Sequence, residues 1–161
     1  MEAEKSNAPV QSIIKAGLLA GTLDISTALI YYYIRSGKNP VNVLNYVASG
    51  VFGKAAFESG TEMAMRGLLF HFIIAFTWTV FFFFLYPSIS LFSKNKIVNG
   101  LMYGIVIWLV MNLAVVPLSN VSVSPFNITQ AIINLVILML AVGLPVSIII
   151  SRHYADKKNS F

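Results

Sequence analysis

The sequence contains no cysteine and little charge, and each absence excludes a class of protein. Without cysteine the chain cannot form disulfides, thiolate metal sites, iron–sulfur clusters or a cysteine nucleophile. Charged residues make up 11% of the 161 residues and hydrophobic residues 57%, whereas an average soluble domain is about 25% charged and about half apolar. A water-soluble domain of this size could not bury so much apolar surface, and a disordered chain would be far more polar. The composition therefore predicts a small integral membrane protein.

Sequence motifs of the common enzyme and cofactor sites are also missing. The chain has no HExxH, GxSxG, P-loop or GxGxxG pattern. Asp24, Glu62 and His71 lack the spacing of metal ligands. The net charge of +5 reflects basic residues near the ends of membrane spans, so it does not indicate nucleic acid. We therefore expect no cofactor, no metal site and no nucleic-acid partner, and an enzymatic activity is left open but disfavoured.

Four stretches of the chain are long and apolar enough to cross a membrane as helices, which takes about 20 residues. We therefore predict a single all-α domain over residues 1–161, a four-span transmembrane helix bundle in contact with membrane lipids. The predicted spans cover residues 16–34, 67–86, 97–116 and 128–150.

Basic residues set the predicted orientation of the bundle, because Lys and Arg accumulate on the cytoplasmic side of membrane proteins. Seven of the eleven lie before span one, between spans two and three, or after span four: Lys5, Lys15, Lys94, Lys96, Arg152, Lys157 and Lys158. The other four lie between spans one and two: Arg35, Lys38, Lys54 and Arg66. The majority predicts that both termini lie in the cytoplasm.

The segment between spans one and two, about residues 40–64, is an unusual insert. Asn39 and Pro40 are typical of a helix start, where an N-cap is followed by proline. Four apolar residues then share one helical face: Val43, Leu44, Val47 and Val51. The segment is too short and too rich in glycine to span the membrane. It predicts either an amphipathic helix lying in the interface, which we favour, or a re-entrant helix packed inside the bundle.

Small residues recur at helical spacing in two of the spans. In the first span, Gly17 and Gly21 share a stripe with Asp24. In the third span, Gly100 and Gly104 begin a second stripe. Because lipid gives helices no hydrophobic reason to associate, close contacts between small residues hold such bundles together. We predict that these four glycines pack the helices against one another.

Asp24 lies well inside the first predicted span. A carboxylate near the middle of the bilayer costs about 3 kcal/mol on insertion scales, so its side chain should face protein and either pair or bind a proton. His71 lies early in the second span, and an antiparallel arrangement of the two spans brings it near Asp24. An Asp–His pair can hold a proton near neutral pH. The alternatives are a structural hydrogen bond for Asp24 and an interfacial position for His71.

Three amide side chains add polarity to the outer halves of spans three and four: Asn112, Gln130 and Asn134. Together with Asp24 and His71 they predict a polar cluster that opens to the outside. The alternative for each amide alone is an interhelical hydrogen bond, worth about 0.6 kcal/mol on average.

Short segments along the chain form a recognisable series: residues 17–24 (GLLAGTLD), 40–44 (PVNVL), 48–57, 67–72, 103–104, 110–119 and 143–145 (GLP). The series resembles a widespread group of small, uncharacterised bacterial inner-membrane proteins, loosely the YagU-like proteins. The resemblance covers nearly the whole chain and implies a four-helix protein of the bacterial inner membrane, without implying a particular activity. That group has a histidine in the last span, whereas residues 134–138 contain none here, so no histidine cluster is implied.

These features support three hypotheses of function. The first is a polar pocket, open to the outside, that takes a small ligand or a proton at Asp24 and His71. The second is an accessory or assembly subunit that packs through its glycine stripes into a homo-oligomer or a larger membrane complex. The third is a membrane enzyme acting on lipid or quinone, which the missing motifs disfavour.

Overall fold

The computed structural model of the chain describes residues 2–58, 60–92, 94–122 and 127–158, and this part consists of helices and short connections. The helices are α1 (Glu2–Ser36), α2 (Val41–Phe52), η1 (Gly53–Phe57), α3 (Gly60–Phe92), α4 (Lys96–Val110), η2 (Met111–Val115), α5 (Val116–Leu118), α6 (Ile128–Ile137), η3 (Leu138–Gly143) and α7 (Leu144–Lys158). The predicted all-α bundle is confirmed, with four helical segments long and apolar enough to cross a membrane.

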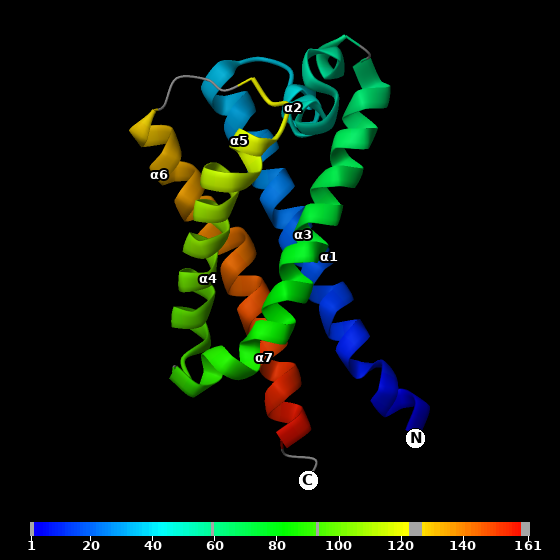
Figure 1. Cartoon of the computed structure of the whole chain (residues 1–161), viewed down its shortest axis with the longest axis vertical. Coiled ribbons are helices and arrows are strands. Elements are labelled where there is room, and N and C mark those ends of the chain that lie inside the picture. The colour runs from blue at the N-terminus through cyan, green and yellow to red at the C-terminus, as the bar shows by residue number, and fades with distance from the viewer. Residues whose placement is uncertain (1, 59, 93, 123–126, 159–161) are drawn as a thin grey trace.

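Four helical rods form the bundle: α1, α3, the run from α4 to α5, and the run from α6 to α7 (Figure 1). Both termini lie at one end of the bundle, and α2 and η1 lie at the opposite end (Figure 1). Large apolar side chains point outward from the rods, for example Ile34 and Leu113, which are 76% and 72% exposed. Such a surface is stable against acyl chains and not against water. The chain is a multi-pass membrane protein.

The helices extend beyond the predicted spans. The four candidate membrane helices cover Ala8–Ser36, Gly60–Ile89, Lys96–Leu118 and Ile128–Lys157. Residues 60–64, which the sequence assigns to the insert, form the first turn of α3. Hydropathy identifies only the part of a helix that lies in hydrocarbon. The helix itself continues into the headgroup region, because polar residues there form the same backbone hydrogen bonds.

The insert forms a short helix at the end of the bundle. α2 begins as predicted, because the side chain of Asn39 accepts a hydrogen bond of 3.0 Å from the backbone of Val41. The helix crosses α3 at Gly67, where an added Cβ would collide with the backbone carbonyl of Leu44. α2 also meets the loop after α5, since the backbone of Asn120 donates to the carbonyl of Gly50 over 3.0 Å. α2 and η1 therefore close the end of the bundle away from the termini.

The face that α2 buries is not its apolar face. Its buried residues are small or polar: Asn45, Ala48 and Ser49. Val51, on the apolar face that the sequence identifies, is 55% exposed. This arrangement is expected for a helix in a lipid environment, because apolar side chains can face acyl chains while small residues let the backbones approach.

Two π-helical segments interrupt the third and fourth rods, and each ends two residues before a proline. η2 precedes Pro117 and η3 precedes Pro145. Proline removes a backbone donor and its ring clashes with the carbonyl four residues earlier. The wider π turn accommodates this clash without ending the helix.

The core lies where the four rods meet near the terminal end of the bundle. It is formed by Ala16, Ala20, Phe82, Phe83, Tyr86, Tyr103, Ile107, Val142, Val146 and Ile150. Polar side chains in this region donate to backbone carbonyls of other helices: Tyr103 to Trp78 over 2.5 Å, and Tyr154 to Phe83 over 3.0 Å. These bonds satisfy the buried hydroxyls and tie the rods together.

The glycines of the third rod lie at its closest helix contact. A Cβ built on Gly100 would be 2.8 Å from the carbonyl oxygen of Gly143. A Cβ on Gly104 would be 2.5 Å from the Cα of Met139. In both places the neighbouring atoms are backbone, so α4 touches η3 and α7 directly through its glycine stripe.

Candidate functional site

The glycine stripe of α1 faces aromatic rings of α3. A Cβ on Gly17 would be 2.6 Å from the ring of Phe76, and a Cβ on Gly21 would be 2.9 Å from the ring of Phe72. The absence of side chains at these two positions lets α1 and α3 come together. Asp24 is one helical turn after Gly21 on the same stripe, so this contact positions the carboxylate next to α3.

His71 is held at this contact by a hydrogen bond to the backbone of α1. Its side chain is buried, and its Nε2 lies 2.8 Å from the carbonyl oxygen of Gly21. Because a carbonyl oxygen only accepts, Nε2 carries the hydrogen of this bond. The other ring nitrogen, Nδ1, is then an acceptor when the ring is neutral and a second donor when the ring is charged.

The structure places Asp24 and His71 at the same contact between α1 and α3. His71 is bonded to the backbone of Gly21, one helical turn before Asp24, and Asp24 is partly buried. In the part of the chain that the structure describes, no hydrogen bond or ion pair joins their side chains directly. The ring of His71 is thus fixed by the backbone of α1 near the carboxylate of Asp24.

Asn45 is a polar residue near this contact that the sequence does not single out. Its side chain is 6% exposed, and its Oδ1 has no hydrogen-bond partner among the described residues. α2 crosses α3 at Gly67, one helical turn before His71. The unpaired Oδ1 of Asn45 is therefore buried on a helix that meets α3 one turn from His71. The pattern that could have revealed it is the small and polar face of α2, which contains Ala48 and Ser49 as well.

The three amides predicted to complete the polar cluster lie elsewhere. Asn112 is exposed, and its amide donates to the carbonyl of Trp108 in its own helix over 2.8 Å. Gln130 is exposed and accepts a hydrogen bond from the guanidinium of Arg35, which ties α6 to the end of α1. Asn134 is exposed on α6. Within the described ranges, no hydrogen bond connects these amides to Asp24 or His71.

The principal depressions of the surface do not reach the Asp24–His71 contact. One is apolar, has a volume of ≈ 560 Å³ and follows α3 from Leu69 to Val80. The other, of ≈ 390 Å³, lies at the terminal end of the bundle between Tyr86 and Ala155. Residues 2–58, 60–92, 94–122 and 127–158 include no group of three or more acidic or histidine residues that could hold a metal ion. Neither of these two depressions is lined by Asp24 or His71.

Comparison with family models, with curated proteins and with solved structures finds no match to this chain.

Proposed function

We propose that this protein is a proton-binding protein of the bacterial inner membrane, with both termini in the cytoplasm, in which Asp24 and His71 hold one exchangeable proton between α1 and α3. The observation that carries the proposal is the 2.8 Å bond from His71 to the carbonyl of Gly21. This bond sets the ring of His71, which lies on α3, against Gly21 of α1, one helical turn before Asp24. Of the six acidic residues in the chain, Asp24 alone lies in the interior of a membrane helix.

A proton is favoured over a larger ligand because neither principal depression is lined by Asp24 or His71. One proton shared by the two groups leaves the pair without net charge, whether it is written as a carboxylate with an imidazolium or as a carboxylic acid with an imidazole. Loss of that proton leaves one negative charge in the bundle, which hydrocarbon strongly disfavours. Proton binding at this site therefore changes the electrostatic energy of the contact between α1 and α3.

The glycine stripes give less support to the accessory-subunit hypothesis. Gly17 and Gly21 face α3, and Gly100 and Gly104 face η3 and α7 of the same chain. These surfaces are therefore occupied within one molecule.

Membership of the YagU-like group and the cytoplasmic placement of the termini remain parts of the proposal. Support for the orientation comes from the basic residues Lys15, Lys94, Lys96 and Arg152, which all belong to the terminal end.

The proposal is tested by infrared spectroscopy of the reconstituted protein during a pH titration. We expect the wild-type protein to show a carboxylic acid absorption that titrates and that Asp24→Asn removes. Asp24→Asn keeps the size and polarity of the side chain, so the protein should still insert and fold. His71→Gln should change the pH midpoint of that absorption, because glutamine can donate to Gly21 but carries no charge.

The matched control is Glu62→Gln, which removes an exposed carboxylate that pairs with Arg66 at the start of α3. This variant should keep the absorption assigned to Asp24. If Asp24→Asn and the wild-type protein titrate identically while both are folded, the pair holds no exchangeable proton and Asp24 has a structural role.

A further inference from the structure

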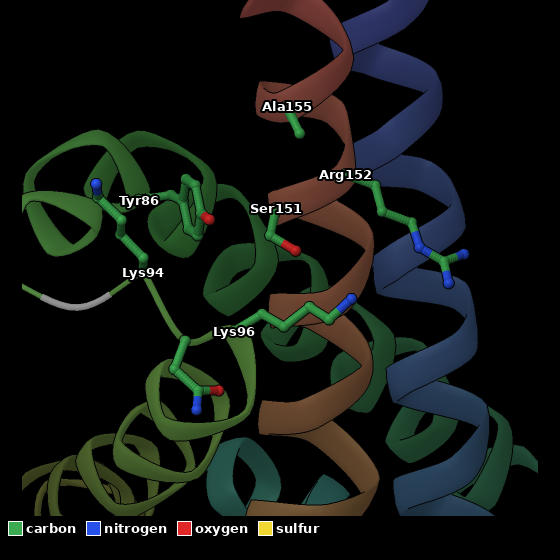
Figure 2. Close-up of a pocket in the computed structure, with 7 residues that line it drawn as sticks. Tyr86, Lys94, Lys96, Ser151, Arg152 and Ala155 are labelled. Carbon is green, nitrogen blue, oxygen red and sulfur yellow. The ribbon is translucent and has the colours of Figure 1, made fainter.

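A basic depression lies at the end of the bundle that holds both termini. It has a volume of ≈ 390 Å³ and is bounded by the last turns of α3, the first turn of α4 and the middle of α7. Tyr86, Lys94, Lys96, Ser151, Arg152 and Ala155 line it, together with Asn95 (Figure 2). It is separate from the Asp24–His71 contact, which shares none of these residues.

Three basic side chains line this depression: Lys94, Lys96 and Arg152. They are exposed, and the described part of the chain offers none of them an ion pair. No acidic residue lines the depression; Asp156, one turn after Arg152 on α7, has an interaction of its own. Figure 2 shows the charged ends pointing in different directions, that of Lys94 away from α7 and that of Arg152 toward α1. Long basic side chains can turn toward a bound anion, and each one that does so stabilises it.

Tyr86 adds a fixed hydrogen-bond donor to the basic depression. Its side chain is only 8% exposed, and its ring is held by Phe82 at 5.8 Å and stacked on Tyr154 at 5.2 Å between ring centroids. Its hydroxyl lines the depression, and no hydrogen bond joins it to another described residue. Figure 2 shows this hydroxyl facing Ser151 across the depression. A rigidly held donor with basic side chains along the same depression is suited to an oxyanion.

The surroundings of the basic depression point to a lipid as the source of the anion. Ile97 and Val98 follow Lys96 directly in the first turn of α4 and are 51% and 45% exposed. The depression is thus at the border between the apolar surface of the spans and the polar end of the bundle. We propose that it binds the phosphate of an anionic phospholipid, with the cations and the Tyr86 hydroxyl on the phosphate oxygens and the acyl chains along α4.

Native mass spectrometry of the full chain in detergent tests this proposal. The protein is titrated with phosphatidylglycerol and, separately, with phosphatidylcholine of the same acyl chains. We expect the wild-type protein to bind phosphatidylglycerol about tenfold more tightly, because three cations favour a headgroup with net negative charge. Tyr86→Phe, which removes only the hydroxyl, should weaken phosphatidylglycerol binding about fivefold to tenfold. The double variant Lys94→Gln/Lys96→Gln should abolish the preference.

The matched control is Lys38→Gln/Lys54→Gln, which removes the same charge from the opposite end of the bundle and should leave the preference intact. Inorganic phosphate is added at millimolar concentration as a separate arm, and it should displace little of the bound phosphatidylglycerol. Equal binding of the two lipids, or equal losses in the control and the Lys94→Gln/Lys96→Gln variant, would overturn the proposal. Complete displacement by phosphate would overturn the lipid as occupant and assign the depression to a soluble anion.

Discussion

Two close helix contacts of the bundle, α1 with α3 and α4 with the fourth rod, are built from glycines in different ways. Between α1 and α3, Gly17 and Gly21 face the rings of Phe76 and Phe72. Between α4 and the fourth rod, Gly100 faces the backbone of Gly143. In the first contact the opposing atoms belong to side chains that can rotate, and in the second they belong to backbone that cannot move without moving a helix.

This difference indicates which contact can respond to a change of charge. Asp24 and His71 lie at the α1–α3 contact, and on the proposed function aromatic rings there can adjust when the pair gains or loses a proton. The α4–α7 contact has no ionisable pair, and close-packed backbone transmits strain instead of absorbing it. We therefore expect the α4–α7 contact to hold the bundle together and the α1–α3 contact to move.

Gly143→Ala should have the largest effect of the three stability variants, because its Cβ would meet the carbonyl oxygen of Gly100. Overpacking against backbone should lower the free energy of unfolding by about 3 kcal/mol. The measurement is equilibrium unfolding in mixed detergents, followed by tryptophan fluorescence. Gly50→Ala is the control, because nothing lies within 3.8 Å of its added Cβ, and it should be neutral or stabilising. Equal stability of the two variants would show that the backbone contact is not tight.

Gly17→Ala should have an intermediate effect of about 1 kcal/mol, since the ring of Phe76 can turn away from the new methyl group. A double-mutant cycle with Phe76→Leu checks the explanation. In the Phe76→Leu background the smaller side chain leaves room, so Gly17→Ala should cost clearly less than it does alone. Strictly additive losses would mean that the ring does not limit the approach of α1.

The fold class follows from the sequence because hydropathy is a local property of each span. The all-α class and four spans are confirmed, but the ends of the helices are not predicted, because their polar turns look like loops. The small and polar inward face of α2 is not among the sequence predictions. Val51, on the apolar face, points outward, where lipid can surround it.

The candidate site is only partly predictable for a geometric reason. Depth along a span can be counted in the sequence, and depth together with an antiparallel arrangement of the first two spans predicts that His71 lies near Asp24. The rotation of a helix about its axis cannot be counted in this way. Asn112 and Asn134 have suitable depth but face outward, because the π segments and the packing of α4 on η3 set the rotation of these helices.

Ser147→Ala should have the smallest effect of the three stability variants, although it alters the same rigid contact as Gly143→Ala. The hydroxyl of Ser147 donates to the carbonyl of Lys96 over 2.7 Å, and interhelical hydrogen bonds in membrane proteins are worth about 0.6 kcal/mol on average. The carbonyl can still accept from its own helix, so no buried group is left unpaired. Thr77→Val, which removes a hydroxyl bonded within α3, should change the unfolding free energy even less. If Ser147→Ala instead destabilised the protein as much as Gly143→Ala, polar bonding and not the shape of the glycine contact would hold α4 against α7.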